Sequence, residues 1–290
     1  MLSRNKLRVL QPAAVLPAAA VMFSMLVTAC VPTAATAEPE TSPVIISEPE
    51  YLHPEILITS DELETVTAGL PAGQREAILE RPQVFLELID QALNQPYEYT
   101  VLVDKSHGLE ADFAPDDLVS LNEYPQLETT RNDLSLKKAI MPMLLALNEA
   151  ARQDGIHLLY GSTYRSYNYQ FNLFNRWVDQ LGAEEAARVS ARAGHSQHQL
   201  GTVVDFSPIS QEFALTPDYQ WLRENAHRFG FSLSYPAGME EITGYNYESW
   251  HWRYIGRTGI QLQQEFFNNV QQHYLSYLHD NRDFFTSKRK

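Results

Sequence analysis

Short strands and helices alternate irregularly along this chain, and this irregularity limits its fold class most strongly. Alternating or continuous apolar residues predict strands over 99–103, 156–161, 202–206 and 250–255. Apolar stripes at helical spacing predict helices over 60–69, 72–94, 134–152, 167–181, 183–193, 216–230 and 258–278. Because no regular strand–helix–strand repeat is present, we expect an α+β fold with a small, mainly antiparallel sheet flanked by helices.

Glycine and proline residues mark the expected ends of several helices. Gly182, Gly194 and Gly230 each follow a helical segment, where a left-handed residue commonly ends a helix. Pro82 divides the helical stretch 72–94, because proline cannot donate the backbone hydrogen bond that a helix interior needs. Thr216 before Pro217 is typical of a helix start.

The composition indicates a globular and acidic protein. Hydrophobic residues make up 44% of the 290 residues, so the chain can bury a core. Its formal net charge is −14. Nucleic-acid binding is not expected, because contact with phosphates requires a basic surface. The single cysteine excludes an intramolecular disulfide and any Cys-rich zinc site. A metal site in this chain must therefore use His, Asp or Glu.

The N-terminus has the features of a bacterial export signal over residues 1–29. Basic residues at positions 4, 6 and 8 precede an apolar run, and small residues then lead to Cys30. This pattern resembles a lipoprotein signal and predicts a lipid on Cys30, which would anchor the exported protein to the bacterial cell membrane. Two alternatives are an uncleaved anchor, although prolines shorten the apolar run below the ~20 residues of a span, and ordinary cleavage after Ala37.

The remaining chain divides into three predicted parts. Residues 30–50 are rich in Pro, Thr and Glu, which is a linker composition. Residues 51–95 form a small helical segment without a catalytic grouping, and residues 96–285 form the main domain. We therefore expect the chemistry to lie in the main domain.

Two neighbouring residues in the main domain are candidates for a buried charged site. Gly201 permits a tight turn between His198 and Asp205, so the histidine faces the strand that follows. On that strand Val203 and Asp205 share one face, and Val204 lies on the other. A carboxylate on an apolar strand needs a partner, and a cation is the simplest one.

A second candidate group lies near residue 250. Trp250 and Trp252 are expected on one face of a strand, which leaves His251 on the opposite face. Glu248 precedes His251 by three residues, so it must lie on a loop or bulge to reach the same place. Two histidines and one aspartate make a plausible three-ligand zinc set with an open fourth position, and a nearby glutamate would serve as general base.

These motifs resemble those of the zinc D-alanyl-D-alanine carboxypeptidases, which include the vancomycin-resistance carboxypeptidase, and of the related L,D-carboxypeptidases. The matching blocks are Ser-x-His-x-x-Gly-x-x-x-Asp, Glu-x-Trp-His-x-Arg and the segments 163–170, 102–105 and 112–118, in the family order. The resemblance covers residues 97–255. Ala193 and Val203 depart from the residues common in the family, Pro and Ala, without removing a ligand.

The resemblance implies a hedgehog/D-Ala-D-Ala peptidase-like fold with a zinc site in a cleft over the sheet. It implies that three residues bind Zn²⁺: His198, Asp205 and His251. It also implies that Glu248 is the catalytic base and that four residues contact the substrate: Arg165, Ser196, Tyr164 and Gln170. Arg165 would bind either the terminal carboxylate or the oxyanion, so it also counts as catalytic.

The expected function is that of an exported zinc carboxypeptidase that removes the C-terminal D-Ala of peptidoglycan stem peptides. One alternative keeps the site but changes the bond, as in an L,D-carboxypeptidase or a crosslink endopeptidase. Another is a non-catalytic cell-wall-binding lipoprotein. A binding protein that has lost the enzymatic activity is expected to lack a metal ligand or the catalytic base. The three ligands His198, Asp205 and His251 and the base Glu248 are all present in this sequence.

Overall fold

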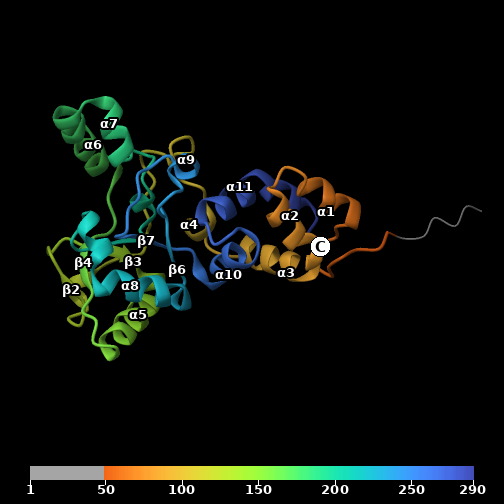
Figure 1. Cartoon of the computed structure of the whole chain (residues 1–290), viewed down its shortest axis with the longest axis horizontal. Coiled ribbons are helices and arrows are strands. Elements are labelled where there is room, and N and C mark those ends of the chain that lie inside the picture. Colours follow the sequence, from red (N-terminus) through yellow and green to blue (C-terminus); the bar gives the residue numbers. More distant parts are fainter. Residues whose placement is uncertain (1–48) are drawn as a thin grey trace, which may run out of the picture. The chain divides into compact units, whose positions relative to one another are not determined.

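A five-stranded sheet lies between two groups of helices in the structure, a computed structural model that describes residues 49–290 (Figure 1). The export signal, Cys30 and nearly all of the linker lie outside the described residues. The strand order is β2 (Glu128–Thr129), β4 (Leu159–Ser162), β5 (Val203–Phe206), β7 (His251–Tyr254) and β6 (Phe231–Leu233). Only β2 and β4 pair in parallel, which confirms the predicted α+β fold with a mainly antiparallel sheet.

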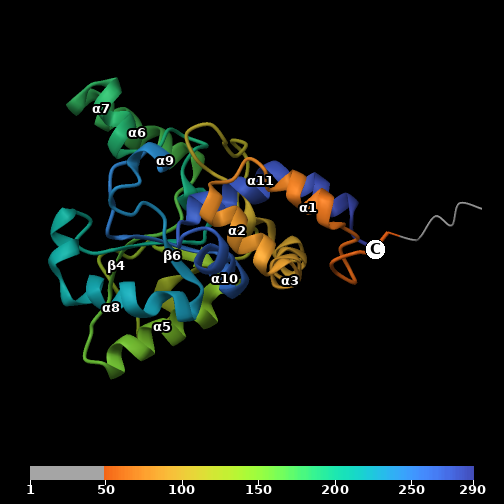
Figure 2. The same ribbon diagram turned by 45° about the vertical axis from the view of Figure 1, so that its right-hand side comes forward.

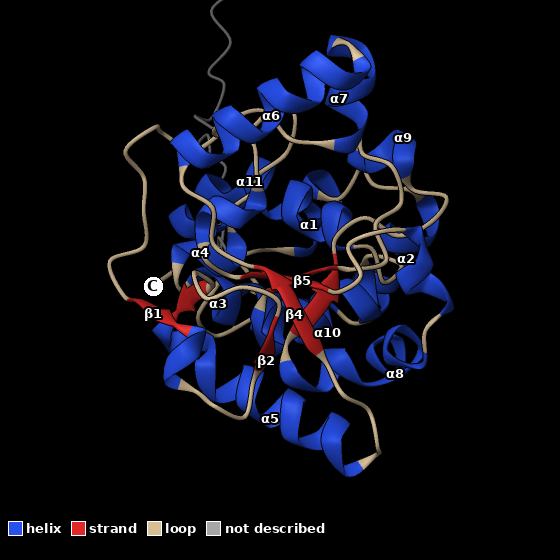
Figure 3. Ribbon diagram, turned by 90° about the vertical axis from the view of Figure 1, so that its left-hand side faces the viewer, coloured by secondary structure: helices blue, strands red, loops and turns tan. Residues whose placement is uncertain are grey.

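One face of the sheet packs on helices α5 (Met141–Gln153) and α8 (Pro217–Asn225). Leu144 and Leu222 of these helices are fully buried in one cluster with Val204 and Phe206 of β5. Helices α6 (Tyr167–Leu181) and α7 (Ala183–Val189) lie on the opposite side (Figure 3). The alternation of β5 therefore directs Val204 and Phe206 to α5 and α8, and Asp205 away from them.

A second core joins the two ends of the described chain. Helices α1 (Ser60–Val66), α2 (Ala72–Glu80) and α3 (Pro82–Leu93) pack with α10 (Gly256–Phe266) and α11 (Gln271–Ser287) (Figure 2). The Phe85 ring lies at its centre, 5.3 Å from the Phe266 ring and 5.9 Å from the Tyr277 ring. The predicted helix break at Pro82 is confirmed, because α3 begins there.

Residues 288–290 at the C-terminal end are held against the N-terminal helices. Arg289 forms a β-bridge with Ile56 and an ion pair of 2.8 Å with Asp90, and Lys288 pairs with Glu62. The basic end of the chain is held because acidic side chains of the N-terminal helices face it.

Three predicted elements differ from the structure. Residues 99–103 are not a strand, because helix α4 covers Tyr97–Thr100 and irregular chain follows. The expected helix over 134–152 begins only at Met141, because Ser135–Lys137 form strand β3, which pairs with β1 (Leu118–Ser120) in a separate sheet. The last expected helix is two helices.

The break between α10 and α11 falls at Asn268 and Asn269, which have φ values of 53° and 57°. Asparagine tolerates this left-handed conformation better than most residues. The Asn269 side chain also accepts a hydrogen bond of 2.9 Å from Gln263, which fixes the turn. Helix α9 (Glu240–Thr243) completes the elements of this part of the chain. Over residues 49–290, none of the helices is both long and apolar enough to cross a membrane.

Candidate active site

The register of the sheet places three polar side chains in one row. Asp205 of β5 lies directly opposite His251 of β7, and Ser162 of β4 lies opposite Asp205 on the other side. Directly opposed residues have Cβ atoms about 4.5–5.5 Å apart, so these side chains are neighbours on one face. This is the face that points away from α5 and α8.

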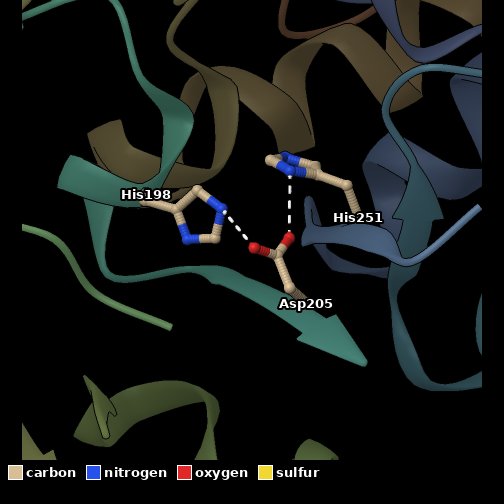
Figure 4. A group of neighbouring side chains, drawn as sticks. All are labelled: His198, Asp205 and His251. Atoms are coloured by element: carbon tan, nitrogen blue, oxygen red, sulfur yellow. Dashed lines mark ion pairs between the residues drawn. The ribbon is translucent and has the colours of Figure 1, made fainter. Parts of the chain in front are cut away.

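His198 reaches the row from the segment before β5. Ser196 caps a short 3-10 helix over Gln197–Leu200, and Gly201, with φ 67°, then turns the chain back into β5. His198 Nε2 lies 3.1 Å from one oxygen of Asp205, and His251 Nδ1 lies 3.2 Å from the other (Figure 4). The predicted turn therefore brings His198 to Asp205, as its spacing indicates.

The remaining ring nitrogens are fixed by hydrogen bonds. His198 Nδ1 donates to the carbonyl of Thr163 at 2.6 Å, and His251 Nε2 donates to Gln197 Oε1 at 3.2 Å. Each proton is thus on the far side of its ring, and each ring directs a lone pair at Asp205. Such hydrogen bonds to the second nitrogen are usual for histidines that bind metals.

The convergence of these atoms fits a divalent metal ion. The ligand atoms of His198, Asp205 and His251 all lie within 4.8 Å of one another, and the three residues are buried. His198 Nε2 and Asp205 Oδ1 make no well-oriented hydrogen bond despite their burial. Buried lone pairs that face a carboxylate require a cation between them. Two histidines and one carboxylate suit zinc and leave a coordination position open.

The protonation states agree with a ligand role. Burial, together with the nearby Arg165 guanidinium, lowers the pKa of His198 to about 4, so the imidazole is neutral. Burial acts to raise the pKa of Asp205, but its contacts with the His198 ring and with the positively charged Arg165 guanidinium outweigh burial and lower this pKa. Neutral imidazole and ionised carboxylate are the forms that bind metals.

Glu248 lies at the same place but comes from a loop, as its spacing predicts. Its backbone N–H donates to the backbone carbonyl of Tyr235 at 3.0 Å, and its Oε2 lies 3.4 Å from His251 Nδ1. Burial and the charge of Asp205 raise the pKa of Glu248 to about 8, and Arg165 acts against them. A cation at the three ligands would favour the ionised form.

Arg165 faces both Asp205 and the pocket. Its Nη2 donates to Asp205 at 2.5 Å and its Nε donates to the Ser162 hydroxyl at 3.0 Å. Gln170 is buried behind it, accepting from Arg165 Nη1 at 3.5 Å and donating to the carbonyl of Ala191 at 2.7 Å. The structure therefore places Gln170 as a support for Arg165 and not on the pocket wall.

The other two predicted substrate contacts lie in different places. Ser196 lines the same pocket as the three ligands, and its hydroxyl also accepts from the His198 backbone N–H at 3.3 Å. Tyr164 lines a neighbouring hollow together with Arg165, and its backbone N–H donates to the backbone carbonyl of Ser135 at 3.0 Å. Of the described residues predicted for the site, only Tyr164 and Gln170 are absent from the walls of this pocket.

The pocket has a volume of about 380 Å³ and one strongly apolar wall. Helix α6 contributes Tyr169, Leu173 and Trp177 to this wall, and Trp250 lies close to the ligands. The volume falls in the range of small-molecule sites, and polar groups at one end with apolar groups around them are typical of such sites.

Sequence reasoning missed two residues that orient side chains of the site, one beside a proposed ligand and one beside Arg165. Gln197 holds His251, and its Oε1 also accepts from the Ser234 hydroxyl at 2.8 Å. Ser162 holds Arg165 from the end of β4. The position of Gln197 between two predicted site residues was an available signal. Nothing in the local sequence marks Ser162, because its role depends on the pairing of β4 with β5.

Comparison with known proteins yields consistent matches. Residues 133–257 match the VanY family, described as D-alanyl-D-alanine carboxypeptidase. A D-alanyl-D-alanine carboxypeptidase of Enterococcus faecalis is 33% identical over 175 residues, which cover 56% of this chain and 65% of the relative. The chain thus spans slightly less than two thirds of this relative, and it covers 66% of YodJ from Bacillus subtilis.

Two solved structures extend the similarity to the fold. The LdcB LD-carboxypeptidase is 31% identical with a TM-score of 0.55, and the match covers 61% of this chain and 85% of LdcB. A variant of the vancomycin-resistance D,D-pentapeptidase VanY, determined in complex with Zn(II), is 28% identical with a TM-score of 0.50. That match covers 61% of this chain and 99% of VanY.

Proposed function

Because this chain belongs to the VanY family of D-alanyl-D-alanine carboxypeptidases, we propose that it is a zinc-dependent carboxypeptidase that removes the C-terminal D-Ala of peptidoglycan stem peptides. The observation that carries the proposal is the convergence of His198, Asp205 and His251 in one pocket with Glu248 beside them. A bound zinc ion would supply a Lewis acid that acidifies water and polarises a carbonyl oxygen.

The side chains of the pocket have separate roles in this proposal. Glu248 accepts a proton from the attacking water and delivers it to the leaving amine. Its burial beside His251 keeps the proton close to the reacting atoms. Arg165 presents its planar guanidinium to the pocket, where it binds the terminal carboxylate or the oxygen that becomes negative.

A free C-terminal carboxylate is expected to be required. Amidation of the terminal carboxyl of a D-Ala-D-Ala stem peptide should lower kcat/KM about 100-fold or more, because a charge-assisted bidentate pair is lost from a desolvated site. Rates with the free and amidated peptides, compared by mass spectrometry of the products, test this. Equal rates would contradict a carboxypeptidase and support cleavage of crosslinks.

An L,D-carboxypeptidase is the second candidate, favoured by the similarity to LdcB. A pentapeptide that ends in D-Ala-D-Ala and a tetrapeptide that ends in a single D-Ala separate the two activities in the same assay. A non-catalytic wall-binding lipoprotein is disfavoured, because all three ligands and the glutamate are in place. Cleavage of neither peptide by the zinc-loaded protein would support that alternative.

We propose further that the protein is exported and anchored to the membrane through a lipid on Cys30. The small residues before the only cysteine of the chain support this. Each buried methylene contributes about 0.8 kcal/mol, so two or three acyl chains hold firmly. Cys30→Ser should release the protein from the membrane fraction or block its processing. Unchanged membrane attachment and an unchanged mature mass would contradict the proposal.

A further inference from the structure

A small basic cavity adjoins the pocket that holds the proposed metal ligands. It has a volume of about 180 Å³, and its polar lining includes Lys105, Arg192 and His195. Two residues, Ser190 and Tyr245, line both this cavity and the larger pocket. The two spaces therefore lie side by side, with Ser190 and Tyr245 between them.

The cations of this cavity have no acidic partner in the part of the chain that the structure describes. Neither Lys105 nor Arg192 forms an ion pair with residues 49–290, and neighbouring Arg188 has only a 3.9 Å contact with Glu185. Asp104 is adjacent in sequence, but its carboxylate is bonded to His107 at 2.9 Å and to Gln272 at 2.8 Å. Lys105 and Arg192 thus give this cavity a positive charge in a chain whose net charge is −14.

The contacts of Lys105 hold it in place for a ligand. A side chain at Gly244, directly after α9, would come within 3.0 Å of Lys105 Cδ, so the glycine makes room for the lysine stem. The ammonium lies 4.8 Å from the centre of the Tyr245 ring, in a cation–π arrangement. Partial burial, together with the charges of Arg188 and Arg192, lowers the pKa of Lys105.

A chain of aromatic rings connects this lysine with the ligands. The Tyr245 ring lies 4.9 Å from the Tyr235 ring, and the Tyr235 ring lies 4.7 Å from the His251 ring. Lys105 is thus three ring contacts away from a metal ligand. An extended peptide advances about 3.3 Å per residue, so about four residues span this path.

We propose that the basic cavity binds a second carboxylate of the substrate peptide, located a few residues before the scissile bond. The inference rests on the proposed function and adds to it a second point of recognition. Lys105 and Arg192 together would neutralise one carboxylate, and Tyr245 would separate this subsite from the reacting end. Two carboxylates of stem peptides have suitable chemistry: the α-carboxylate of a γ-linked glutamate and the additional carboxylate of a diaminopimelate residue.

Matched peptides test the proposal and distinguish these two sources. The reference is L-Ala-γ-D-Glu-L-Lys-D-Ala-D-Ala. In the second peptide the glutamate carboxylate is a carboxamide, and in a third diaminopimelate replaces lysine. If the glutamate carboxylate binds in the cavity, the wild-type zinc-loaded protein should cleave the reference peptide with a kcat/KM about 10-fold higher than that of the carboxamide peptide. If the diaminopimelate carboxylate binds there, the third peptide should be cleaved with a kcat/KM about 10-fold higher than that of the reference. Both expectations follow because hydrogen bonds to charged groups are stronger than hydrogen bonds between neutral groups.

The variants K105M and R192Q should bring that preference ratio close to one, whereas exposed Lys138→Met serves as the matched charge control and should leave the ratio unchanged. Zinc content and thermal unfolding are measured in parallel, so a loss of fold is recognised separately. A wild-type protein that cleaves the peptides at equal rates, or variants that keep the wild-type ratio, would overturn the subsite. Cleavage of none of the peptides would instead contradict the proposed function.

Discussion

Replacing His251 by alanine is expected to remove stoichiometric zinc and to lower kcat/KM on a stem peptide by more than 100-fold. The three ligand atoms lie within 4.8 Å of one another, so the loss of one leaves an incomplete set. Losing a residue that merely orients a ligand already costs 10- to 100-fold in metal affinity or activity, so losing the ligand itself should cost more. Metal analysis after dialysis and initial rates measure the two effects.

His53→Ala is the matched control for this variant. His53 is 6% exposed, close to the 4% of His251, but it lies among the N-terminal helices, where it contacts Glu87 at 3.1 Å. Removal of a buried histidine there should leave the zinc content near one per chain. Stoichiometric zinc in a variant without His198, Asp205 and His251 would refute the proposed metal site.

Glu248→Ala is expected to lower kcat by about 10²- to 10⁴-fold while zinc remains bound, because general acid–base catalysis typically contributes that much. The three ligands are untouched by this change, so metal analysis should give a value near that of the wild type. Glu248→Gln should behave in the same way, since the amide preserves the shape of the side chain but cannot accept the proton. Stopped assays on a defined stem peptide provide kcat.

The control for Glu248 is Glu241→Gln, on the exposed surface of α9. It removes the same charge without touching the pocket and should keep kcat within about 2-fold, as expected for a surface position. If Glu248→Ala loses its zinc, the residue is a ligand or a structural support. If it keeps nearly full kcat, another group moves the proton.

Local sequence patterns were sufficient for part of the candidate site. The alternation of residues 203–206 predicted that Asp205 leaves the apolar face of its strand, and the structure confirms it, since Val204 and Phe206 are in the core. Gly201 predicted the turn that returns His198 to Asp205. Both inferences depend on fewer than ten residues of chain, a range over which backbone geometry alone constrains side-chain direction.

Tertiary contacts overrode local propensity elsewhere. Residues 99–103 have the composition of a strand, but the carbonyls of Glu98 and Val101 accept hydrogen bonds from the buried Arg253 guanidinium at 3.1 Å and 2.8 Å. The irregular chain after α4 is stabilised by this distant residue. No pattern within residues 99–103 contains that information.

The sequence by itself determined the faces on which Asp205 and His251 lie and the turn that returns His198 to them, because these follow from the periodicity of strands and the conformation of glycine. Only the tertiary structure decided which faces meet. The register of β5 against β7 sets Asp205 opposite His251, and Gln197 then fixes the proton of that histidine. The tertiary structure also places Lys105 beside the pocket, with its ammonium over the Tyr245 ring. Such contacts join segments far apart in the chain, and they depend on the packing of the whole fold.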